Sequence, residues 1–248
     1  MEESHTTIAG YLRERREAAR LTRAELAHKA NVSEALIQKL EQGTRPPTST
    51  ALGALFRALD IPAVYREYAA TVLQPELTTV TGGDSGPSPG ELAFLASLPH
   101  PACYQTAPAQ DLIAANTAYL QAFPGLEPGA NIMAWMLLDP RARQVVEDWN
   151  REAHIMVQAF RYMAPGLTPP ERIDQITHQC AQSPDWQRLW STDIDPTRMD
   201  WRPVRIRPID GSKWTSMHVQ LLRCEQPRRE WYVYSMVPLE AEDQQQAP

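Results

Sequence analysis

Residues 21–43, LTRAELAHKANVSEALIQKLEQG, constrain the fold of this chain more than any other segment. Thr22, with Glu25 three residues later, predicts the capping box of one helix, and Ser33 predicts the N-cap of a second. The turn between them is predicted at residues 31–32. Apolar residues recur at helical spacing, so one face of each helix packs against the other. The segment therefore predicts two short helices joined by a tight turn, with the outer face of the second helix exposed.

Apolar positions on both sides of this pair extend it to an all-α domain of five helices over residues 1–73. The extra positions also recur at helical spacing. They are Ile8, Leu12 and Ala19 in the first helix, Leu52, Leu55 and Leu59 in the fourth, and Val64, Tyr68 and Val72 in the fifth, after Pro62. Residues 74–90 lack this periodicity and contain TGGDSGPSPG, so we interpret them as a linker.

The charge distribution also separates the two parts of the chain. Residues 1–74 carry ten Lys and Arg against nine Asp and Glu, whereas residues 75–248 carry fourteen against twenty-one. A net charge of +1 is small for a nucleic-acid-binding domain, so attraction to DNA must come from the placement of individual Arg and Lys residues. We therefore expect the two parts to bind different partners.

The second part predicts an α+β domain over residues 91–240. The expected order is strands at 102–106 and 111–115, a helix from Asn116, helices within 131–192, and strands at 201–207, 214–222 and 231–237. This order suits a five-stranded antiparallel sheet with helices on one face, the layout of PAS domains. Residues 241–248 are predicted to be a disordered tail.

Three dipeptides mark where elements of this second domain begin or turn. Asp139-Pro140 predicts that residues 141–163 form one long helix. Ser183-Pro184 predicts the start of a later helix, and Asp210-Gly211 predicts a hairpin between the first two C-terminal strands.

The second helix of the turn motif is the predicted DNA-reading element, because such a helix enters the major groove while the preceding helix crosses the backbone. Lys39 can donate to guanine, Glu34 can accept from cytosine, and Ala35 can contact a thymine methyl group. Residues at the start of the first helix of the motif, and residues just after its second helix, are placed to contact phosphates. The predicted DNA-facing residues are Arg23, Ser33, Glu34, Ala35, Gln38, Lys39, Thr44 and Arg45, of which Arg23, Thr44 and Arg45 contact phosphate. The alternatives are an ordinary helical bundle, a Glu34 that is only solvated, and an Ala35 that is neutral.

The same segment, continued as GTRPP, resembles the helix-turn-helix of the XRE family, the phage-repressor-like regulators, over about residues 8–73. The resemblance implies a λ-repressor-like domain that binds double-stranded DNA. It also implies a structural ion pair between Arg16 and Glu41. We expect this chain to bind as a homodimer to an inverted-repeat operator, because one small reading domain covers too few base pairs.

Residues 91–238 resemble the ligand-binding domain of MmyB-like regulators, a PAS-like module found behind XRE domains in bacteria. The matching pieces are LASLPHPACYQ, NIMAWMLLDPRARQVVEDW, the pair Phe160-Arg161, SPDWQRLW and the closing strands. The resemblance implies a sensor for a small apolar ligand, such as a fatty acid. Large apolar side chains along two predicted helices suit such a ligand, and an arginine or histidine can hold a carboxylate. The predicted ligand-binding residues are Met133, Met136, Trp149, His154, Phe160 and Arg161; the alternative is that they form plain core and that Arg161 pairs with an acidic neighbour.

An enzyme is not favoured by the sequence. No His, Cys, Asp or Glu spacing matches a metal site or a nucleophile with its base, so we predict no catalytic residue, metal or cofactor. Cys103, Cys180 and Cys224 lie far apart, and no apolar run approaches the length of a membrane span, so a cytoplasmic protein is expected. The function predicted is a bacterial DNA-binding regulator with a ligand sensor. The alternative is a regulator whose second domain serves dimerisation or protein docking without an effector.

Overall fold

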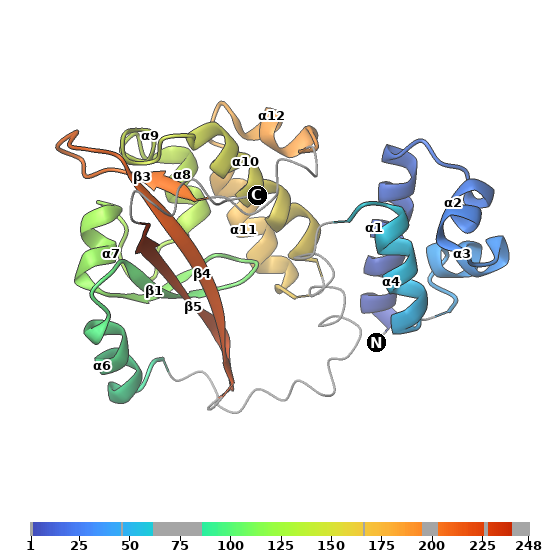
Figure 1. Ribbon diagram of the computed structural model, residues 1–248, viewed down its shortest axis with the longest axis horizontal. Helices are drawn as coiled ribbons and strands as arrows, with labels where there is room; N and C mark the ends of the chain where they lie inside the picture. The colour runs from blue at the N-terminus through green and yellow to red at the C-terminus, as the bar shows by residue number, and fades with distance from the viewer. Residues whose placement is uncertain are drawn as a thin grey trace. The chain divides into compact units, whose positions relative to one another are not determined.

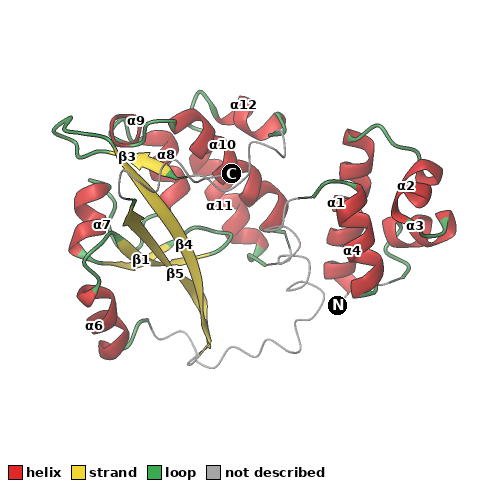
Figure 2. Cartoon of the chain, viewed as in Figure 1, coloured by secondary structure: helices red, strands yellow, loops and turns green. Residues whose placement is uncertain are grey.

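The computed structural model describes residues 2–45, 47–61, 86–165, 167–194, 203–225 and 228–239. The chain divides into two compact units, of which the first contains residues 1–79, 165–169 and 195–200 and the second contains residues 80–164, 170–194 and 201–248. Each unit buries its own set of apolar side chains. The first is helical and the second is α+β, as predicted (Figure 2).

The first unit begins with four helices, α1 Glu2–Ala18, α2 Arg23–Ala30, α3 Glu34–Glu41 and α4 Ser49–Ala58 (Figure 1). They enclose large apolar side chains that include Ile8, Leu26 and Ile37, each at most 2% exposed. Ala19, predicted in the first helix, lies just beyond its end, because Arg20 takes a left-handed conformation with φ 55°. The predicted fifth helix, with Val64, Tyr68 and Val72, lies outside the described residues.

The helix caps follow the sequence prediction. Thr22 Oγ1 accepts a hydrogen bond from Glu25 N at 3.2 Å, and Glu25 Oε2 accepts one from Thr22 N at 2.7 Å, which completes the capping box of α2. Ser33 Oγ accepts from Leu36 N at 3.2 Å at the start of α3. Asn31 ends α2 in the left-handed region with φ 53°, which makes the tight turn.

The second unit contains one five-stranded sheet in which every strand pair is antiparallel, in the order β2-β1-β5-β4-β3. This confirms the predicted PAS-like arrangement. The strands are β1 Ala102–Thr106, β2 Leu112–Ala115, β3 Val204–Ile206, β4 Thr215–Glu225 and β5 Arg228–Pro238. The helices are α6 Pro89–Ser97, α7 Thr117–Ala122, α8 Ile132–Leu138, α9 Ala142–Val145, α10 Trp149–Met163, α11 Pro170–Cys180 and α12 Trp186–Ser191.

Successive strand residues face opposite sides of this sheet, so it has two buried layers. Cys103 and Met236 belong to the larger layer, which is filled by side chains from α7 to α12. Tyr104 and Val233 belong to a smaller layer on the other face, where Leu95 of α6 packs. The predicted helical face is therefore present, and one further helix covers part of the opposite face.

Helix α6 begins inside the segment predicted as linker. Ser88 and Glu91 form a capping box, with Pro89 in the first turn. Glu91 also accepts two hydrogen bonds from Arg229 of β5, both at 2.9 Å, and these bonds, together with those from Ser88, lower the pKa of Glu91 to about 2. The ion pair fastens α6 to the sheet.

The long helix predicted over residues 141–163 is wrong, because the structure divides it into α9 and α10. Val146 is extended and bridges to Ile206 of β3, and Glu147 N donates to Arg205 O at 3.0 Å. Pairing with the sheet edge thus competes with helix continuation. Asp139 ends α8 and holds Arg141.

Candidate functional site

Helix α3 turns a polar face to solvent because its apolar positions point into the first unit. Ile37 and Leu40 are 1% and 3% exposed. The predicted base-reading side chains are exposed, namely Glu34, Ala35, Gln38 and Lys39. Ser33 is the N-cap, so its hydroxyl is engaged with Leu36 N and serves the helix. The structure therefore brings these four positions together on one accessible helix of two turns.

Glu41, the last residue of α3, fixes how this helix sits in the unit. Its carboxylate accepts from Arg16 Nε at 2.6 Å and Arg16 Nη2 at 3.1 Å, which confirms the expected ion pair. Arg23 Nε adds a third bond at 2.8 Å. The Glu41 side chain is 1% exposed, so α1, α2 and α3 meet at one buried carboxylate.

The electrostatics of Glu41 favour its charged form. Burial opposes ionisation, but the hydrogen bonds from Arg16 and Arg23 outweigh it and lower the pKa of Glu41. Arg16 also donates to Leu21 O at 2.9 Å, so the guanidinium spans the turn between α1 and α2. These charge-assisted hydrogen bonds fix the orientation of α3 relative to α1 and α2.

The predicted phosphate-contacting residues lie at the start of α2 and just after the end of α3. Arg23 is 36% exposed, so its guanidinium is partly in solvent although Nε is bound to Glu41. Thr44 and Arg45 follow α3 and are exposed. The Thr44 hydroxyl donates to Lys39 O at 3.1 Å. Arg23 therefore has a structural contact that the sequence analysis did not assign to it.

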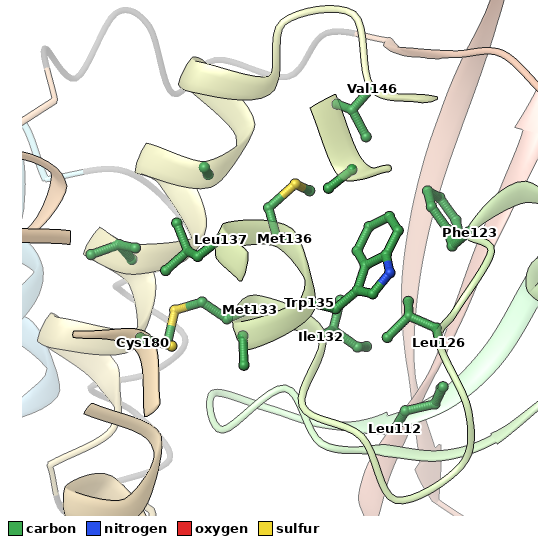
Figure 3. Close-up of a cluster of buried hydrophobic side chains, with 14 of the residues drawn as sticks. Leu112, Phe123, Leu126, Ile132, Met133, Trp135, Met136, Leu137, Val146 and Cys180 are labelled. Carbon is green, nitrogen blue, oxygen red and sulfur yellow. The ribbon is translucent and has the colours of Figure 1, made fainter. Parts of the chain in front are cut away.

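The predicted apolar ligand residues of the second unit lie in its core. Met133 and Phe160 are both fully buried, and Met136 and Trp149 are 7% and 5% exposed. Trp149 Nε1 donates to Met136 O at 2.7 Å, which joins α10 to α8. Figure 3 shows Met133, Trp135 and Met136 pointing from α8 into different parts of this cluster.

The two predicted polar anchors lie instead on the side of α10 that faces the end of α12. Arg161 Nη1 donates to Trp190 O at 2.8 Å and lies 3.8 Å from Asp193. His154 Nε2 lies 2.7 Å from Thr192 O. Both side chains thus serve the carbonyl groups at the C-terminal end of α12, where cations and N–H donors are stabilising. The contact with Asp193 agrees with the alternative prediction, that Arg161 pairs with an acidic neighbour.

Comparison with known proteins supports both sequence resemblances. Residues 7–69 match the family model of a helix-turn-helix domain. Residues 87–247 match that of the MmyB-like transcription regulator ligand binding domain, which covers more than half of the chain. The chain is an MmyB-like transcription regulator. A search of the curated proteins finds no match to this regulator.

Among the described residues of the MmyB-like regulator, Gln158 and Gln110 are buried polar side chains that the sequence analysis missed. Gln158 Nε2 donates to Leu189 O at 2.6 Å, and Gln110 Nε2 donates to Met156 O at 3.3 Å. Each bond fixes the orientation of the amide, because a flipped oxygen would face a carbonyl. Both Oε1 atoms are then buried with no partner among the described residues. In the sequence, Gln158 interrupts the apolar stretch MVQAF, and this pattern could have indicated a buried polar side chain.

Neither unit of the regulator contains, in its described part, a group of three or more His, Cys, Asp or Glu residues placed to hold a metal ion. Cys103 is fully buried, and burial raises the pKa of its thiol to about 12. No described helix is long and apolar enough to cross a membrane. The two matching families are a DNA-binding domain and a ligand-binding domain rather than enzymes.

Proposed function

We propose that this regulator binds an inverted-repeat operator as a homodimer through α3 and that its second unit senses a small apolar ligand, such as a fatty acid. The observation that carries the proposal is the exposed polar face of α3, capped by Ser33 and held by the buried Glu41 network. Because α3 is fixed in this way, its four exposed side chains keep one arrangement when the helix enters the major groove.

The DNA part is tested by selecting duplexes from a random pool with the full-length protein. We expect enrichment of two inverted half-sites whose centres lie about 34 Å apart, one turn of the double helix. Enrichment of a single half-site would contradict the homodimer, and no enrichment at all would contradict sequence-specific binding.

Phosphate contacts are tested through the salt dependence of binding. Arg23→Ala should weaken binding to all sequences alike and lower the slope of log affinity against log salt by about 1. Arg57→Ala is the matched control, because Arg57 is exposed on α4 and outside the predicted DNA face. An unchanged slope for Arg23→Ala would mean that Arg23 contacts Glu41 but no phosphate.

The ligand part is supported by the apolar interior and by the two buried glutamine oxygens. A buried acceptor without a donor costs about 1–3 kcal/mol, and a hydroxyl or protonated acid group of a ligand would remove that cost. Native mass spectrometry beside a denatured spectrum tests for a retained molecule. An apolar acid on a dimer supports the sensor, and its affinity must differ with and without operator because linkage is reciprocal.

The second candidate is a regulator whose C-terminal unit only dimerises or docks a protein partner. The occupied anchors favour it, since Arg161 and His154 already contact α12 carbonyl groups. A ligand-free dimer that binds operator with full specificity, and that added fatty acids leave unchanged, would establish this alternative.

A further inference from the structure

The carboxylate of Glu41 is shared by two arginines, and their remaining donors are used differently. Arg16 has all three nitrogens engaged: Nε and Nη2 donate to Glu41, and Nη1 donates to Leu21 O at 2.9 Å. Its side chain is 9% exposed. Arg16 is therefore a buried group whose three nitrogens all serve the fold of the first unit.

Arg23 binds the same carboxylate through one nitrogen. Its Nε donates to Glu41 Oε2 at 2.8 Å, and within the described part of the chain neither Nη1 nor Nη2 of Arg23 forms a hydrogen bond. The side chain is 36% exposed. A guanidinium carries five N–H donors in a rigid plane, so the four on the Nη atoms stay available. An arginine can bind one phosphate through two parallel hydrogen bonds of this kind.

The charge around Glu41 also favours an anion. Arg13 Nη2 donates to the Glu41 carbonyl oxygen at 2.8 Å, in addition to the two arginines on its carboxylate. Among the described residues, the carboxylates in contact with these three guanidinium groups are those of Glu41 and of Glu17, which lies 3.3 Å from Arg16. Three positive charges against two negative ones leave one positive charge in excess beside the partly exposed Arg23.

The position of Glu41 connects the Arg23 guanidinium with base reading. Glu41 is the last residue of α3, and Arg23 is the first residue of α2. In a helix-turn-helix the second helix enters the major groove while the first crosses the backbone, and phosphate contacts fix the register on the duplex. The hydrogen bond from Arg23 to Glu41 therefore fixes a group placed to meet the backbone relative to the helix placed to meet the bases.

We infer that Glu41 is a positioning residue for DNA binding: it holds Arg23 by Nε while Nη1 and Nη2 of the same guanidinium bind one backbone phosphate. The two contacts are made at once, so a single side chain joins the end of α3 to the duplex. The inference rests on the proposed reading of bases by α3 and adds the group that couples this helix to the backbone.

Arg23→Lys separates the two contacts in the full-length protein. A lysine ammonium is one compact group, so it can pair with the Glu41 carboxylate or reach a phosphate but cannot span both. We expect Arg23→Lys to recover the midpoint of helix unfolding that Arg23→Ala lowers, as followed by circular dichroism. Both variants should nevertheless bind the selected duplex about tenfold more weakly than the wild type and lower the slope of log affinity against log salt by about 1.

Arg45→Lys is the matched control, because Arg45 is exposed just after α3 and forms no ion pair with any described residue. Its lysine keeps a charge available for phosphate, so the slope should stay unchanged and the affinity should fall by about threefold or less. A wild-type slope in Arg23→Lys, or an unchanged unfolding midpoint in Arg23→Ala, would overturn the simultaneous contacts.

A double-mutant cycle tests the positioning by Glu41. Arg23→Ala is introduced into the wild type and into Glu41→Gln, and duplex affinity is measured at a temperature at which circular dichroism shows every variant folded. A glutamine amide offers one uncharged acceptor oxygen in place of two charged ones, so Arg23 loses its fixed orientation. Arg23→Ala should then reduce affinity by about threefold or less, against about tenfold in the wild type. An equal or larger reduction in Glu41→Gln would overturn the positioning.

The outcomes also separate this inference from the proposed function. If a duplex is selected and Arg23→Lys keeps the wild-type slope, only the coupling of α3 to the backbone is wrong. If the selection described above enriches no duplex, base reading by α3 fails. The salt slopes are then measured on a duplex of random sequence, where a lower slope in Arg23→Lys still supports the phosphate contact and an unchanged slope overturns it.

Discussion

Helices α3 and α10 were both predicted to carry functional side chains, and the structure treats them differently. On α3 the predicted residues are exposed, and the buried positions belong to Ile37, Leu40 and Glu41. On α10 Phe160 and Trp149 are core, and Arg161 is bound to the end of α12. The exposed polar face of a helix can be recognised as a surface from its spacing, whereas its apolar face has the same pattern whether it lines a pocket or fills a core.

The comparison is tested most severely by Phe160→Ala. If Phe160 is core, the substitution leaves a cavity and should lower the free energy of unfolding by about 3–5 kcal/mol. All seven Trp residues lie between residues 135 and 231, so Trp fluorescence during urea unfolding reports the second unit. Phe94→Ala is the matched control, because Phe94 is 50% exposed. A loss below about 1 kcal/mol would instead indicate a side chain that already borders a void.

The corresponding test on the first unit is Glu41→Gln. Removing this carboxylate leaves the buried Arg16 with only the exposed Glu17, at 3.3 Å, as a counter-charge, and the cost should be about 3 kcal/mol. Helix loss followed by circular dichroism, with Trp fluorescence unchanged, would assign the effect to the first unit. Glu34→Gln, exposed on the same helix, should change the unfolding free energy by less than about 0.5 kcal/mol.

The same residue predicts a pH dependence with a definite sign. The folded-state pKa of Glu41 lies below its ordinary value, so its stabilising contribution is fully present above the ordinary carboxyl range. The contribution is lost as the pH falls through the folded-state pKa. Glu41→Gln should therefore flatten the acid limb of the helix unfolding curve; an equally steep limb in the variant would place the titrating group elsewhere.

The sequence predicted local features well because their causes are local. Thr22, Ser33 and Asn31 specify caps and a turn by their own hydrogen bonds and dihedral angles, and the strand alternation specified the sheet. The break after α9 was not predictable, because Val146 is extended by pairing with Ile206, sixty residues later in the chain. The burial of Gln158 and the contact of Arg161 with Trp190 depend on the same kind of distant packing.

Base reading by α3 should give a smaller effect, expressed in specificity rather than stability. If Lys39 donates to guanine, Lys39→Ala should reduce discrimination at one base pair of the half-site by about 1–3 kcal/mol. Lys29→Ala is the control, since Lys29 on α2 lies 3.4 Å from Asp60. Binding to a panel of single-base operator variants measures both. A Lys39→Ala protein with unchanged preference would mean that another face of α3 meets the bases.

The smallest effect is expected at Arg161, where the two interpretations of α10 separate. As a partner of Trp190 O and Asp193, Arg161 contributes a partly exposed, charge-assisted contact, so Arg161→Gln should lower the unfolding free energy of the second unit by about 1 kcal/mol. Arg205→Gln, which removes an exposed ion pair with Glu147, should cost less. If native mass spectrometry finds an apolar acid on the wild type and on Arg161→Gln alike, the arginine belongs to the α12 cap, and the buried Gln158 oxygen becomes the group to test against the ligand. Loss of the acid from Arg161→Gln alone, with stability preserved, would return the carboxylate-binding role to α10.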